Sequence, residues 1–299
     1  MPLSGLPAEG EWPVPQLVDR ERLEVARSEE PFREVAVGLA MEFGALTALI
    51  AMVRAGGAGG GIATRDTAVL RGLAVRVVKL TRALIAETFA GHGELQALYD
   101  RLLFESIVDF AYLLRGGAER MQAFVLDALR ADRELWDHLA SNRELRAGEE
   151  LPMERRARLA LEAKFALAGV APELVPAPGE ASPWPPLEER LRAIGEPKAS
   201  AMHQLGAGGT HGAWHELTAH HLSPDGELSA RLAWSRPLVQ PLLALAIQGG
   251  RVLAAYARQL GPAAEQAFRG RYLDLARRAA EADALHEEFL ARADLLPPP

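Results

Sequence analysis

The segment Leu98–Leu114, LYDRLLFESIVDFAYLL, indicates the fold class of this chain. It is largely apolar except for one line of polar residues, because Arg101, Glu105 and Asp109 recur at every fourth position. Residues four apart lie on one face of an α-helix, and Tyr112 follows three residues later. A helix that is apolar on its other faces packs inside a bundle. We therefore predict a central helix that carries an ionic ladder, Arg101–Glu105–Asp109, in or near the core.

Apolar residues recur at helical spacing through most of the remaining chain, and no stretch shows the alternation that is typical of strands. Glycine pairs and prolines separate these stretches. The predicted helices cover residues 31–54, 64–90, 94–115, 118–140, 153–168, 187–194, 199–205, 210–222, 235–260 and 262–293. The sequence predicts an all-α fold, a multi-helix bundle with long antiparallel helices.

The distribution of proline divides the chain. Residues 1–30 contain scattered prolines and predict an irregular N-terminal arm that ends in a short helix over Gln16–Ser28. Residues 31–299 are predicted to form a single helical domain with a long C-terminal helix at 262–293. Within it, the proline-rich segment 170–186 is expected to be a loop that packs on the surface through Trp184.

Composition limits the classes of protein. The chain has 299 residues, of which 49% are hydrophobic, and a net charge of −7, which does not favour a broad nucleic-acid surface. It has no cysteine, and Met1–Leu17 lacks the features of a secretory signal. Arginine greatly outnumbers lysine, which together with abundant alanine, glycine and leucine indicates GC-rich bacterial coding. We expect a cytoplasmic protein.

Two apolar segments are long enough to require a test against a membrane span. Val35–Val53 carries Glu42, and Leu238–Ala257 carries Arg251. A charge near the middle of a bilayer costs about 3 kcal/mol on insertion scales. Buried bundle helices explain both segments at lower cost, so we expect no membrane association.

Five of the eight histidines fall between His203 and His221. His211 and His215 are one helical turn apart, which is the spacing of a two-histidine metal site. The zinc-protease signature requires a glutamate directly after the first histidine, and Gly212 occupies that position. We assign no metal and leave the cofactor unknown, with His211 and His215 as the only metal-ligand candidates beside a structural histidine cluster.

One pair of residues has the spacing of a nuclease motif. Helical ribonucleases of the HEPN superfamily use an arginine followed four to six residues later by a histidine, and Arg133 and His138 have this spacing. About two such matches would arise by chance in a chain so rich in arginine. No catalytic residue is assigned.

The Arg101-x-x-x-Glu105 helix with its trailing Tyr112, together with the segment His211-Gly-x-Trp214, resembles a bacterial family known as domain of unknown function 5677. The resemblance covers about Val69–Leu222. It implies a helical bundle in which the Arg-Glu helix and the His-Gly helix approach each other, and it supplies no reaction. Gly206–Gly209, just before the histidine, departs from the family pattern.

These observations define a candidate polar site in which the ladder meets histidines from a distant segment: Arg101, Glu105, Asp109, Tyr112, His211 and His215. The leading hypothesis is a regulatory or interaction module that binds a protein partner or forms a homo-oligomer. In that case Glu105→Ala lowers stability by about 3–5 kcal/mol if its arginine stays buried. The alternatives are a metal-dependent or HEPN-like hydrolase acting on nucleic acid, and a small-ligand-binding bundle. Whether the protein is an enzyme stays open.

Overall fold

A computed structural model of the protein describes residues 6–53, 64–197, 199, 214, 217–223 and 229–292. Over these residues the chain is a multi-helix all-α protein, as the sequence predicts. The first part consists of η1 (Glu9–Glu11), α1 (Arg20–Glu24), α2 (Glu30–Met52), α3 (Arg65–Ala90), α4 (Gly93–Leu114), α5 (Ala118–Ala128), α6 (Arg130–Leu145), α7 (Pro152–Ala168), η2 (Pro172–Leu174) and α8 (Leu187–Ala193).

The second part begins with a short turn and a two-stranded antiparallel ribbon in which Leu222 pairs with Ala230. Two helical stretches then follow, residues 240–260 and 262–292, and each of them contains one π-helical segment. The elements are η4 (Leu217–His221), β1 (Leu222–Ser223), β2 (Ser229–Ala230), α11 (Gln240–Ala244), η5 (Leu245–Gly249), α12 (Gly250–Leu260), α13 (Pro262–Ala264), η6 (Glu265–Arg269) and α14 (Gly270–Arg292).

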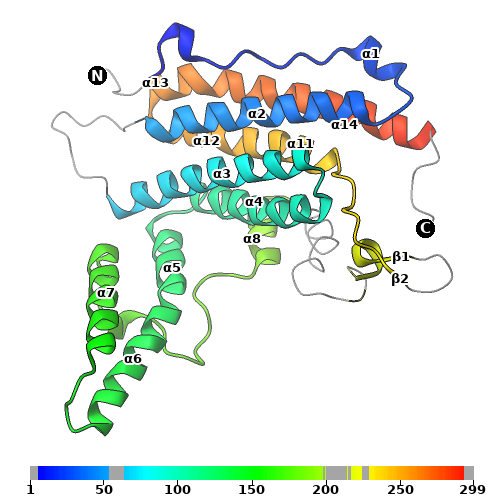
Figure 1. Cartoon of the computed structure of the whole chain (residues 1–299). Coiled ribbons are helices and arrows are strands. Elements are labelled where there is room, and N and C mark those ends of the chain that lie inside the picture. Colours follow the sequence, from blue (N-terminus) through cyan, green and yellow to red (C-terminus); the bar gives the residue numbers. More distant parts are fainter. Residues whose placement is uncertain are drawn as a thin grey trace.

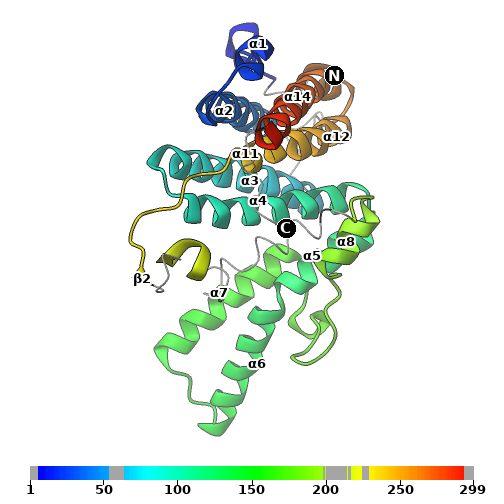
Figure 2. The same ribbon diagram turned by 90° about the vertical axis from the view of Figure 1, so that its right-hand side faces the viewer.

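The helices form a bundle from which one group projects. Figure 1 shows α2, α12 and α14 in the upper part, with α3 and α4 beneath them and α8 below α4. Helices α5, α6 and α7 extend away from the bundle, and the rotated view of Figure 2 shows the same separation. We call α5–α7 the projecting arm.

The main core lies between α2, α3, α4, α12 and α14. Its fully buried aromatic side chains include Phe43, Phe110, Phe268 and Tyr272. Gly249 permits close packing against α2, because a Cβ at this position would lie 2.5 Å from Cζ of Phe43. The absence of a side chain at Gly249 therefore lets η5 approach α2 closely in the core.

Helix α2 is long and apolar enough to cross a membrane, and it is the one such helix among the described residues. In the structure, 61% of its most apolar window is buried in the protein. The single charge of its apolar residues 35–52, Glu42, is bound by Arg278 of α14. These are the properties of a core helix.

The predicted continuity of residues 118–140 and the predicted helix start at Ser235 are both wrong. The helix expected over residues 118–140 is divided at Leu129, where the chain bends and the buried Leu129 side chain joins the small core of the projecting arm. Ser235 does not begin a helix, which starts only at Gln240. The side chains of Glu94 and Gln96 on α4 bind the backbone N–H groups of Ser235 and Leu238, and they hold this segment in a non-helical conformation.

Candidate functional site

The ionic ladder lies on α4, as its spacing predicts. Arg101 donates from Nε to Oε1 of Glu105 at 3.1 Å, one helical turn away. The side chain of Arg101 is 22% exposed and that of Glu105 is 37% exposed. Glu105 is therefore more open to solvent than the sequence suggests.

Asp109 is the more buried carboxylate of the ladder. Its partner is Arg190 of α8, which confirms the expectation that its donor comes from another part of the chain. The Asp109 side chain is 20% exposed and that of Arg190 is 11% exposed. Burial lowers the pKa of Arg190, and the negative charge of Glu105 opposes this effect. Arg190 Nε also donates to the carbonyl of Pro185 at 3.0 Å.

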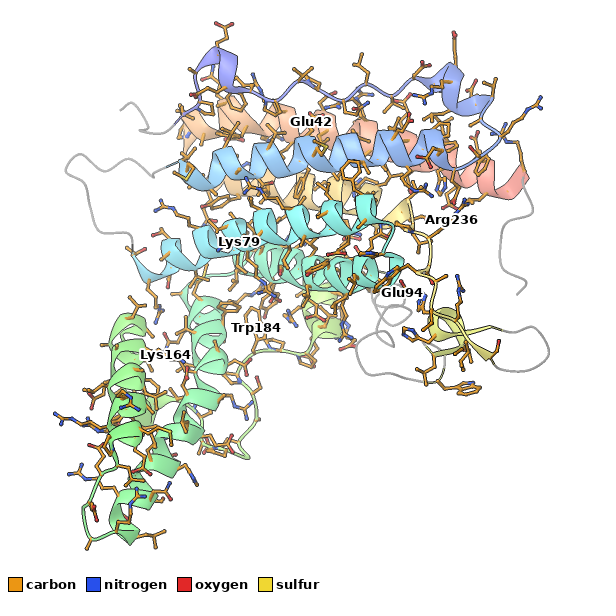
Figure 3. All side chains as sticks on the ribbon, viewed as in Figure 1. Glu42, Lys79, Glu94, Lys164, Trp184 and Arg236 are labelled. Carbon is orange, nitrogen blue, oxygen red and sulfur yellow. The ribbon has the colours of Figure 1, made fainter. Side chains whose placement is uncertain are left out.

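Tyr112 stands at the end of the ladder in a group of aromatic rings and arginines. Its ring meets Trp184 edge-on at 5.2 Å between centroids, and the guanidinium of Arg120 lies 3.9 Å above it. Trp184 also packs edge-on against Phe124 of α5. Figure 3 shows Trp184 beside α5, below α4. The proline-rich loop is thus anchored through Trp184, as expected.

The candidate histidines cannot be placed with the ladder, because His211 and His215 lie outside the described residues. Their convergence with Arg101 and Glu105 stays a prediction. Nearby in the chain, His220 Nδ1 lies 2.7 Å from Oγ of Ser235. Within the described parts of the chain, no cluster of three histidine, aspartate or glutamate residues could hold a metal ion.

Arg133 and His138, which have the spacing of the nuclease motif, do not form a shared site in the structure. Arg133 Nε binds both carboxylate oxygens of Asp137, at 2.9 and 2.7 Å, and Nη1 donates to the carbonyl of Pro172. His138 is exposed on the projecting arm. The guanidinium of Arg133 thus secures η2 to α6, which is a structural role.

The ion pair Glu42–Arg278 was not predicted from the sequence. Arg278 binds Glu42 through two hydrogen bonds of 2.7 and 2.9 Å, and both side chains are nearly inaccessible. The backbone N–H of Gln16 donates to Glu42 at 2.8 Å, and Arg278 donates to the Gln16 carbonyl. The sequence did show Glu42 as the single charge inside the apolar segment 35–53. No neighbouring residue indicated that its partner is Arg278, which lies 236 residues away in the chain.

The projecting arm has a small core of its own, centred on Val125, Leu129, Leu161 and Phe165. Trp136 of α6 packs edge-on against Phe165 of α7 in this small core. Every residue of α6 is described, and none of them is buried. Helices α6 and α7 thus extend past the small core of the arm, and few of their apolar side chains are buried.

The outer face of α7 carries exposed apolar residues. Met153, Leu159 and Leu167 are all exposed, the last of them at 86%. Arg155 and Arg156 are exposed beside them. In the described part of the chain, no carboxylate forms an ion pair with either arginine. This face therefore combines apolar side chains with unpaired positive charge.

Comparison with known proteins finds no match, since no family model matches the chain and no curated protein or solved structure is detectably similar to it. The resemblance to the domain of unknown function 5677 stays a prediction.

Proposed function

We propose that this protein is a helical interaction module whose projecting arm binds an amphipathic helix of a partner protein. The observation that carries the proposal is the outer face of α7, where Met153, Leu159 and Leu167 are exposed on a helix that projects from the bundle. Exposed apolar groups that gather on one face are typical of interaction sites. The arm has few intramolecular contacts that could cover them.

The spacing of this face matches helix-in-groove recognition. Met153, Ala160 and Leu167 are seven residues apart in turn, Ala163 lies between the last two at helical spacing, and Leu159 adjoins Ala163 one turn earlier. Such a stripe packs against the apolar stripe of a second helix. Small residues in its centre allow the two helix axes to approach closely.

Charge selects the kind of partner. The stripe is flanked at one end by Arg155 and Arg156, which form no ion pair with any described residue. Near the other end, Lys164 is already paired with Asp132. A parallel second copy would place these two arginines opposite their own equivalents. Like charges in such positions disfavour self-association. A partner helix with an apolar stripe and acidic flanks satisfies both features.

The test is binding of two synthetic amphipathic helical peptides to the full chain, measured by fluorescence anisotropy. The peptides share one leucine stripe and differ only in glutamate or lysine flanks. We expect the glutamate peptide to bind and the lysine peptide to bind at least about tenfold more weakly. The double variant Leu159→Glu/Leu167→Glu should remove binding, because it places charge in the apolar interface.

The matched control is Val14→Glu/Val25→Glu, which adds two charges at exposed positions outside the arm. It should bind the glutamate peptide like the unchanged protein. Equal binding of both peptides, or full binding by the leucine variant, would contradict the proposal. Self-association that the leucine variant abolishes would instead assign the surface to a second copy, and light scattering measures this directly.

A further inference from the structure

A small pocket lies between α4, α8 and α12, separate from the projecting arm. Its walls are mainly apolar and come from three elements: Val108 and Ala111 of α4, Leu191 of α8, and Val252 of α12. Ile194, just after α8, completes the apolar lining. Because the walls come from distant segments, the pocket exists only in the folded protein.

The volume of the pocket is about 140 Å³. An apolar cavity of about 150 Å³ accommodates benzene in an engineered protein. The space therefore suits a compact apolar body of about six carbon atoms, such as an aromatic ring.

Charged groups stand around this apolar lining. Arg115 of α4 borders the pocket and donates to the carbonyl of Ile194. Arg251 of α12 also borders it, and among the described residues no carboxylate forms an ion pair with its guanidinium. Glu196 contributes one negative charge, so the three groups together carry one net positive charge.

We propose that this pocket binds a small monocarboxylate whose compact apolar body enters between α4, α8 and α12 while its carboxylate pairs with Arg251. A guanidinium and a carboxylate match in shape and charge, and form paired hydrogen bonds. Glu196 disfavours a dianion such as a phosphate monoester, because like charges repel. This binding site is independent of the proposed docking surface on the arm.

The pair Asp109–Arg190 explains how the pocket keeps its shape. Helix α8 has seven residues, which is too short for an isolated helix to persist in water. Arg190 fastens it to Asp109 of α4, and Leu191 then faces the pocket. Asp109 and Arg190 are therefore positioning residues for one wall of the pocket and do not touch the ligand.

The experiment is titration of the full chain with benzoate and with benzamide, its neutral counterpart, followed by ligand-observed NMR. We expect benzoate to bind with a dissociation constant below about 10 mM and benzamide to bind at least about tenfold more weakly. Arg251→Gln should weaken benzoate to the level of benzamide and leave benzamide unchanged. Arg251→Lys should retain part of the difference, since it keeps the charge without the paired geometry.

Two further variants make the result specific to this pocket. Val252→Phe should abolish binding of both compounds, because the larger ring occupies the space; Val252 is only partly buried, so the fold tolerates the change. The arm variant Leu159→Glu/Leu167→Glu should bind benzoate normally, which separates this inference from the proposed function. Absence of benzoate binding, equal affinity for benzamide, or an Arg251→Gln variant that binds benzoate normally would each overturn the proposal.

Discussion

Two ionic clusters of this protein use similar residues in opposite ways. Glu42 and Arg278 have side chains that are 5% and 7% exposed, and the backbone of Gln16 satisfies both of them further. Asp109 and Arg190 are 20% and 11% exposed and lie next to the walls of a pocket. The first cluster is closed, whereas the second adjoins the pocket through Val108 and Leu191, the sequence neighbours of Asp109 and Arg190.

The difference separates a structural role from a positioning role. The closed cluster joins the N-terminal arm, α2 and α14, and Gly38 makes room for Gln16, since a Cβ there would lie 2.6 Å from its Cδ. Its carboxylate and guanidinium have no remaining access to a ligand. The open cluster holds only α8, so its loss should change a local surface more than the whole fold.

The largest expected effect is on the closed cluster. Glu42→Ala leaves Arg278 buried with only Asp274 as a charged partner, and we expect the free energy of unfolding to fall by about 3–5 kcal/mol. Urea denaturation measures this change. The double variant Glu42→Leu/Arg278→Met should recover most of the loss, because it removes both charges. A loss below about 1 kcal/mol in the single variant would remove the distinction between the clusters.

The next effect concerns the open cluster. Asp109→Asn should lower global stability by only about 1–2 kcal/mol, because water can reach the remaining Arg190 charge in part. Hydrogen exchange should show the loss of protection in α8 before any loss in α2 or α14. Equal loss of protection in all three helices would show that this pair supports the whole fold.

A third carboxylate on α4 sharpens the comparison, because Asp100 is partly buried and forms no ion pair with any described residue. Burial raises the pKa of Asp100 to about 6. The folded state then holds this proton to higher pH than the unfolded chain, so stability falls as pH rises from about 4 to 6 and stays lowered above.

We expect Asp100→Asn to raise stability at neutral pH by about 1–2 kcal/mol, less than the full shift implies because the side chain is not wholly buried. Urea midpoints at several pH values measure this. Above the raised pKa the gain should be constant, and it should shrink as the pH falls through that pKa toward the ordinary value for aspartate. A variant less stable than the unchanged protein at neutral pH would contradict this account.

The smallest effect is expected at the exposed end of the ladder. The coupling between Arg101 and Glu105, isolated by a double-mutant cycle of alanine variants, should be about 0.3–1 kcal/mol. Glu105 is too exposed for the loss of 3–5 kcal/mol that a buried pair would give. A coupling above about 2 kcal/mol would mean that this pair behaves like the closed cluster.

The sequence by itself determined the helices and several of their ends. Apolar residues at helical spacing predicted α2, α3, α4, α7 and the C-terminal helical stretch, and Thr64 caps α3 as expected by accepting a hydrogen bond from the N–H of Thr67. These features are local, because helical periodicity and capping involve residues only a few positions apart. The spacing of the ladder on α4 belongs to the same class.

The tertiary structure alone decided which groups meet. Arg278 is 236 residues from Glu42, and Arg190 reaches Asp109 from a helix too short to orient itself. The non-helical segment at Ser235 and the bend at Leu129 likewise depend on packing against distant residues. Local sequence determines which face of a helix a residue occupies. The partner of that face depends on how the helices pack, and residues distant in the sequence contribute to this packing.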